Sequence, residues 1–209
     1  MPYAKNVKPE ESRDRIFNAA ATEFAVHGFA GASVDRIAAA AGLNKAMIYY
    51  HFDSKADLYR RILDDMFGSV EARVKPLAQT PGTAEDRIRA FVEAIALEAE
   101  VRPHFPPIWC REIADGGTHL DNDVVSRLAG ILKTLAGIIQ DGVAAGAFRP
   151  VAPLLVHVGI VGPLLLFFAT GGLRLRVDRA GVSGAAGLDR DAVVAHIQGV
   201  ALATLRGQI

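Results

Sequence analysis

The chain has 209 residues, with 23 Lys and Arg against 23 Asp and Glu, and 51% of its residues are hydrophobic. This composition is too apolar for a disordered chain, and the zero net charge excludes a uniformly basic, histone-like binder of nucleic acid. The single cysteine, Cys110, can form no internal disulfide, and a cysteine-based zinc site would need several.

The first fifteen residues contain no apolar run of the kind that a secretory signal requires. A single cysteine is also typical of proteins that are not exposed to an oxidising compartment. We therefore expect a cytoplasmic protein.

Apolar residues recur at intervals of three and four along most of the chain, which is the period of an amphipathic helix. We predict an all-α fold of about nine helices, divided into a small unit over residues 1–55 and a larger one over 56–209, with a connecting helix at about 54–75. The apolar stripes that support this prediction run through residues 16–24, 34–41, 58–70, 124–139 and 194–205.

The small unit contains clear helix boundaries. Gly28 and Gly42 suit the left-handed conformation that ends a helix, so they predict the ends of the first and second helices. Ser33 can cap the start of a short second helix, and Asn44 can cap a third that runs to about Tyr50. The run from Ser54 to Asp57 has the spacing of a capping box and predicts the start of a fourth helix.

Two short helices separated by a tight glycine turn, after a longer first helix, form the layout of a helix-turn-helix reader. Ile48 and Phe52 are four residues apart, so both can pack inward against the first two helices. The opposite side of the third helix is then free to enter a DNA major groove, which is about 12 Å wide. The residues on that side are Asn44, Lys45, Ala46, Tyr49 and Tyr50.

These side chains suit contacts with DNA. Lys45 can donate to guanine or to phosphate, Asn44 can read a base edge or simply cap its helix, and Ala46 allows a close approach to a thymine methyl group. The hydroxyls of Tyr49 and Tyr50 can donate to phosphate oxygens. Plainer roles stay open, because the tyrosines could be half-buried packing residues and Lys45 a solvated surface lysine.

Three further residues of this region have two interpretations each. Ser33 and Lys55 lie at helix N-termini, where they can contact phosphate. His51 can read a base, but we favour a structural hydrogen bond for it.

The run from Ser33 to Leu58 resembles the DNA-binding module of the tetracycline-repressor (TetR) family, over about a quarter of the chain. The resemblance implies that Ser33, Lys45, Tyr49, Tyr50 and Lys55 occupy positions that contact DNA, whereas Asn44 stands where serine is common. The matching elements are Ser33, the turn Ile37-Ala38-x-x-Ala41-Gly42, the helix end Ile48-Tyr49-x-His51-Phe52, and Lys55-x-x-Leu58.

The same resemblance implies a homodimeric transcriptional regulator, usually a repressor, that binds a palindromic operator in double-stranded DNA. Residues 1–55 would form the DNA-binding domain, and residues 56–209 would bind a small-molecule effector and form the dimer. Binding of the effector would release the operator. We expect no cofactor.

Residues 151–173 include no Asp, Glu, Lys or Arg and are long enough to span a bilayer. Pro153, Pro163 and several glycines argue against a membrane span, so we expect instead a dimerisation helix that is kinked at Pro163. With the last helix, at about 189–206, it would build a four-helix bundle between subunits. The expected interface residues are Leu164, Leu165, Phe168, Ile197 and Ala201.

A ligand pocket needs apolar walls with a few polar groups. Residues around 104–112 combine both kinds, although an ordinary core would use the same aromatic residues. Cys110 could sense redox state only with a lowered pKa and access to solvent. The pocket candidates are His104, Phe105, Trp109, Arg111, Glu112, Leu135 and Phe167.

The chain contains no His-Glu-x-x-His, Gly-x-Ser-x-Gly, Walker A or Gly-x-Gly-x-x-Gly motif, and its histidines lack metal-ligand spacing. We therefore expect neither an enzyme nor a metal protein. The alternative is a ligand-binding helical protein, or an enzyme on the same scaffold, that binds no operator.

Overall fold

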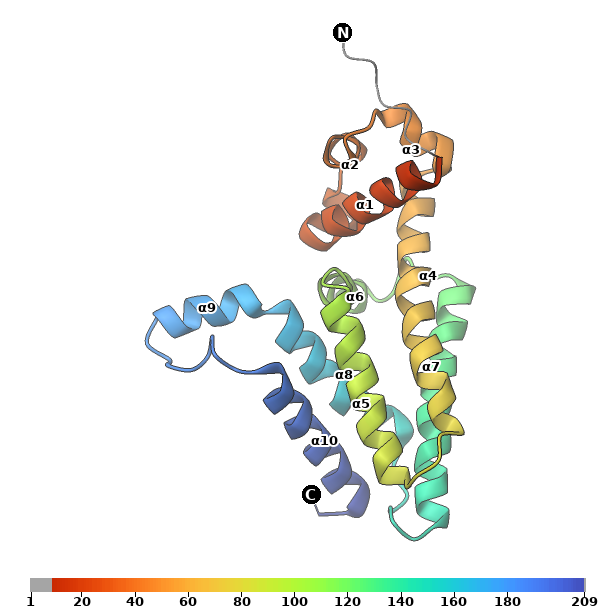
Figure 1. Ribbon diagram of the computed structural model, residues 1–209, viewed down its shortest axis with the longest axis vertical. Coiled ribbons are helices and arrows are strands. Elements are labelled where there is room, and N and C mark those ends of the chain that lie inside the picture. Colours follow the sequence, from red (N-terminus) through yellow and green to blue (C-terminus); the bar gives the residue numbers. More distant parts are fainter. Residues whose placement is uncertain (1–8, 209) are drawn as a thin grey trace.

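The computed structural model describes residues 9–208 (Figure 1). Within these residues every regular element is a helix and no strand occurs, so the prediction of an all-α fold is confirmed. Residues 1–8, on which the signal-peptide expectation partly rests, and residue 209 lie outside the described residues. The helices are α1 (Pro9–Gly31), α2 (Val34–Ala41), α3 (Lys45–His51), α4 (Lys55–Val74), the 3-10 helix η1 (Lys75–Ala78), α5 (Ala84–Val101), α6 (Phe105–Ala114), α7 (Asn122–Ala144), α8 (Pro153–Ala169), α9 (Gly171–Arg179) and α10 (Arg190–Arg206).

Helices α1, α2 and α3 pack against one another and are hereafter called the reader, and the helices that follow are called the larger unit. The centre of the reader is apolar, because Ile16, Phe24, Ile37, Ile48 and Phe52 are all buried. The backbone is left-handed where α1 bends and where α2 ends, with φ of 69° at Gly28 and 64° at Gly42. The predicted end of the second helix at Gly42 is therefore confirmed, whereas Gly28 marks a kink after which α1 continues to Gly31.

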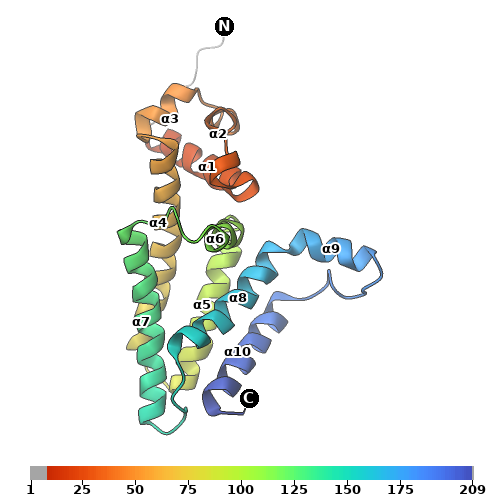
Figure 2. The ribbon, with the colours of Figure 1, turned by 180° about the vertical axis from the view of Figure 1, so that it is seen from behind.

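The long helix α4 leaves the reader and packs along α7 in the larger unit, and α5 lies beside both (Figures 1 and 2). Helices α8 and α10 cover the other side of α5. Helix α6 packs against α1 of the reader and against α8 of the larger unit. Helix α6 therefore lies between the two units, as does the first part of α4.

A short helix follows α8 in a glycine-rich region. Residues 171–187 contain five glycines, yet α9 occupies Gly171–Arg179. Helix α8 continues through Pro163, and the chain bends by 65° between α8 and α9. Within residues 9–208, no single helix meets the length and hydropathy of a membrane span, and only the bent pair of α8 and α9 does so when taken together.

Gly142 on α7 provides a test of core packing. A Cβ atom at this position would lie 2.1 Å from Cδ2 of Phe148, which is itself buried. Gly142→Ala should therefore lower the free energy of unfolding by about 1–3 kcal/mol, the usual cost of overpacking. Gly137→Ala on the same helix, where nothing lies within 4 Å, is the matched control. Equal urea midpoints for the two variants would contradict this packing.

Candidate nucleic-acid interface

The outer face of α3 presents the residues that the sequence predicts. Tyr50 is 71% exposed and Tyr49 is 51% exposed, whereas Ile48, on the opposite side of the helix, is buried in the core. Asn44, Lys45 and Ala46 at the start of α3 are also exposed. The structure therefore brings the five residues together on one short helix with a free outer side, as a major-groove reader requires.

The first turn of α3 is held by hydrogen bonds within the reader. Asn44 Oδ1 accepts from the amide of Met47 at 3.0 Å, so Asn44 caps the helix. Lys45 Nζ lies 3.1 Å from Asp35 Oδ1 on α2, and both side chains are at least half exposed. An exposed ion pair of this kind is weak, so the ammonium group can transfer to a phosphate or a base.

The far end of α3 is joined to α1. His51 Nε2 lies 2.6 Å from Ser12 Oγ, and the His51 ring packs edge-on against Tyr50 at 4.9 Å. Ser12 also donates to the carbonyl of Pro9. His51 therefore has the structural hydrogen bond that the sequence analysis favoured.

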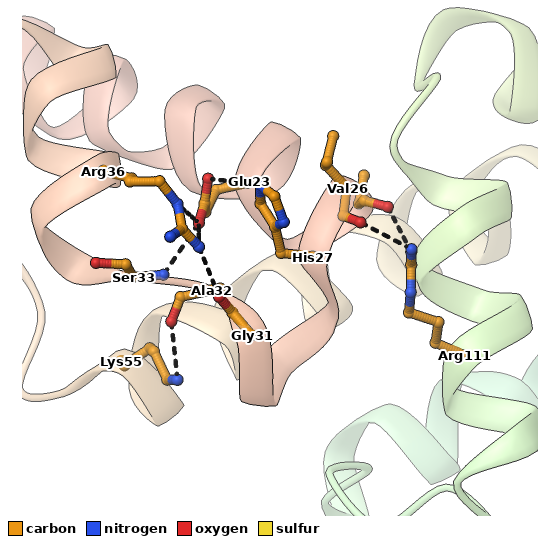
Figure 3. A network of polar contacts seen from close by, with 10 residues as sticks. Glu23, Val26, His27, Gly31, Ala32, Ser33, Arg36, Lys55 and Arg111 are labelled. Carbon is orange, nitrogen blue, oxygen red and sulfur yellow. Dashed lines mark hydrogen bonds and ion pairs between the residues drawn. The ribbon is translucent and has the colours of Figure 1, made fainter.

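Ser33 starts α2 without a hydrogen bond from its side chain to the helix. Its amide donates to Glu23 Oε1 at 3.0 Å, and Arg36 donates to the same oxygen at 2.7 Å (Figure 3). Although partial burial opposes it, these hydrogen bonds keep the pKa of Glu23 below its usual value. The expected side-chain cap is absent at Ser33, and Glu23 binds the turn instead.

Lys55, for which a contact with phosphate stays a prediction, has partners within the subunit. Its ammonium group donates to the carbonyls of Phe29 at 2.8 Å and Ala32 at 3.2 Å, and it lies 4.6 Å from the centre of the Phe29 ring. These acceptors are twenty or more residues away in the chain, so no local pattern could indicate them. Lys55 ties α4 to the turn between α1 and α2.

The predicted pocket residues around α6 pack mainly into the core. Trp109 and Phe105 pack edge-on against Phe67 with ring centres 4.8 and 5.9 Å apart, and Leu135 is buried in the core. These residues are ordinary core, the interpretation that the sequence left open. His104 instead lines a surface cleft between α1, α4 and the end of α5.

Arg111 and Glu112 link α6 to the reader and to α4. Arg111 donates to the carbonyls of Ala25 and Val26 on α1. Glu112 is buried and accepts from the Tyr59 hydroxyl at 2.7 Å. Burial and this carboxylate raise the pKa of Tyr59, so the hydroxyl stays a donor. Both side chains therefore have partners within the subunit, and a ligand pocket at these two residues stays a prediction.

Cys110 does not have the properties of a redox sensor. Its side chain is half-buried, and burial raises the pKa of the thiol. A raised pKa lowers the fraction of reactive thiolate. No group of three or more metal-binding side chains occurs in the part of the chain that the structure describes.

Of the pocket candidates, Phe167 does line an apolar groove. The groove lies between α8, α9 and α10 and has a volume of about 520 Å³. Arg174 stacks over the Phe167 ring at 4.1 Å and donates to its carbonyl. Pro163, Leu166 and Ile197 supply further apolar walls.

The predicted interface residues are wrong in register. Leu164, Leu165, Ile197 and Ala201 are buried within their own subunit, and Phe168 is half-buried against the same core. Because α8 is apolar on all sides, its sequence gives no periodic signal for the outer face. The exposed apolar side chains on these two helices, hereafter the outer face, are Leu154, Leu155, Val158 and Leu166 on α8 and Val200 on α10.

Known proteins resemble this chain in sequence and in fold. A family model described as bacterial regulatory proteins of the tetR family matches residues 16–62. An HTH-type transcriptional repressor of Streptomyces coelicolor is 50% identical over 56 residues, which cover 27% of this chain but only 29% of that protein. The HTH-type repressor NicS of Pseudomonas putida is 30% identical over 148 residues, 67% of each chain. The structure of the fatty acid degradation regulator FadR from Bacillus halodurans superposes with a TM-score of 0.72 at 21% identity, over 93% of this chain and 96% of that one.

Proposed function

Because the chain belongs to the TetR family of bacterial regulatory proteins, we propose that it is a homodimeric repressor that reads a palindromic operator. The observation that carries this proposal is the exposed outer side of α3, with Lys45, Tyr49 and Tyr50 on a helix whose inner side is buried. Lys45 and Ala46 would face the bases, and the tyrosine hydroxyls and Ser33 would face phosphates.

The dimer would form through the outer face of α8 and α10. Several large apolar side chains exposed on two neighbouring helices suit an interface, because large apolar patches are rare on the surface of monomers. Gly159, Gly162 and Gly199 on the same two helices have open space where a Cβ would lie, so a partner helix could approach closely. Two readers held at a fixed separation would then match two operator half-sites.

The proposed effector is a small amphipathic molecule. The groove beside Phe167 has the size of a ligand site and apolar walls, and the guanidinium of Arg174 could meet an anionic group. Leu166 belongs both to the groove and to the outer face, so a partner subunit would help to enclose a ligand there.

A gel-shift experiment separates this proposal from its alternative, a ligand-binding protein or enzyme that binds no operator. The probe is the intergenic DNA beside the chain's own gene, at several salt concentrations. A regulator should give a discrete, salt-sensitive complex that competitor DNA does not remove. The absence of any specific complex, with this DNA and with random-sequence DNA after rounds of selection, would reject operator binding.

Lys45→Ala should weaken operator binding by about 1–3 kcal/mol, the usual worth of a side-chain contact with a base pair. Fluorescence anisotropy with the selected operator measures the change. Asp35→Ala is the matched control, because it removes the partner 3.1 Å from the ammonium group and keeps the lysine. The control should bind at least as tightly as the parent protein, since it removes a negative charge near the DNA. If Lys45→Ala leaves the affinity unchanged, Lys45 does not read the operator.

A further inference from the structure

The end of α1 is bound by positively charged side chains from three other helices (Figure 3). Arg36 on α2 donates to the carbonyl of Gly31, and Lys55 on α4 donates to those of Phe29 and Ala32. Arg111 on α6 donates to those of Ala25 and Val26. Among these three cations, Arg111 is the one that comes from a helix wholly within the larger unit.

The guanidinium group of Arg111 bonds two neighbouring carbonyls of α1, so it constrains the orientation of α1 relative to α6 as well as the distance between them. Its Nη1 bonds the carbonyl of Ala25, and its Nη2 bonds that of Val26 at 3.0 Å. Both acceptors lie in the turn just before Gly28, where the backbone leaves the regular helix. Carbonyls at a helix end need outside donors and attract positive charge. A planar guanidinium with two donors in a fork restricts rotation between α1 and α6 more than a single ammonium group could.

Gly28 brings the two helices close together. This glycine is buried, and a Cβ atom on it would lie 3.2 Å from Cδ of Arg111. The aliphatic stem of Arg111 therefore passes directly over the bend of α1. Any larger residue at this position would also be strained by its positive φ of 69°.

Helix α6 is itself anchored on its other side. Glu112, the next residue, accepts from the Tyr59 hydroxyl of α4 and lies 2.9 Å from Nδ1 of His119 in the α6–α7 loop. These contacts fix α6 to the larger unit. The reader is thus attached to a fixed support through Arg111, in addition to its covalent connection through α4.

We propose that Arg111 is a positioning residue that sets the orientation of the reader and thereby the operator half-site spacing that the dimer accepts. This inference rests on the proposed function. Each inserted base pair moves one half-site by about 3.4 Å and turns it by about 35°. A reader held in one orientation rejects that displacement, whereas a reader that can rotate on α4 alone tolerates it.

The test measures binding of the full-length protein to its selected operator and to versions with one or two base pairs inserted or removed at the centre. The parent protein should prefer one spacing by about tenfold or more, because a displaced half-site loses base contacts. Arg111→Ala should reduce this preference to about threefold or less. Arg111→Lys, which keeps the charge and the stem but not the fork, should fall between the two.

Arg87→Ala is the matched control. Arg87 likewise donates to a backbone carbonyl, that of Ala78, and to Asp141, but it joins elements within the larger unit. The Arg87→Ala variant should keep the parent's full preference for one half-site spacing. Melting temperatures of all variants report any general loss of stability. If a folded Arg111→Ala variant, or Arg111→Lys should alanine not fold, keeps the parent's preference, the inference is wrong. If the parent protein binds no DNA, the proposed function fails instead.

Discussion

Leu155→Arg should convert the proposed dimer into monomers and abolish tight operator binding. Leu155 belongs to the outer face and is 68% exposed, so arginine should cost little in an isolated subunit but would be buried without a partner in the proposed dimer. An unpaired charge at an interface costs several kcal/mol, and about 3 kcal/mol corresponds to about a hundredfold weaker association. Analytical ultracentrifugation measures the dimer, and gel shift measures the operator complex.

The contrast with two other positions makes this prediction specific. Val125→Arg on α7 changes a valine that is also exposed but lies on a different helix, so it should leave both measurements unchanged. Leu165→Arg, at a residue buried in its own subunit, should unfold the chain rather than yield folded monomers. Folded dimers of Leu155→Arg at the parent's dissociation constant would place the interface elsewhere.

The reader could be predicted from the sequence because its signals are local. Gly28, Gly42 and Asn44 each act on the backbone within one helical turn of themselves. The structure confirms Gly42 as a helix end and Asn44 as a helix cap, and it shows a kink at Gly28 where a helix end was predicted. The spacing of Ile48 and Phe52 identified the buried side of α3, and therefore also its free side. When a short helix lies between two defined caps, few alternative assignments remain for its ends and for its buried side.

Less of the larger unit could be predicted from the sequence, because its contacts depend on residues that are far apart in the chain. Trp109 has the same sequence signature in a ligand pocket as in a core, and only Phe67 on α4 decides between the two. The acceptors of Arg111 lie more than eighty residues away. In α8, apolar residues on every side hide which face is covered, so Leu165 was placed outward and lies inward.

A second large effect is expected at a buried ion cluster between α4 and α5. The Glu98 carboxylate is completely buried. Its Oε1 accepts from Arg73 Nε at 2.5 Å, and its Oε2 accepts from Arg102 Nη1 at 2.6 Å. Replacing both arginines by methionine would keep most of their apolar stems but leave a buried charge without a cation. We expect the free energy of unfolding to fall by about 3–5 kcal/mol, a large part of the usual total for a domain.

Urea unfolding of the double variant measures this loss, and a third substitution identifies its cause. Adding Glu98→Leu removes the buried charge, so the triple variant should recover most of the lost stability, because well-packed apolar residues often replace a buried ion cluster without loss. If the triple variant stays as unstable as the double one, the arginines stabilise the protein through packing rather than by pairing with Glu98. If the double variant loses less than about 1 kcal/mol, the carboxylate does not depend on these two cations.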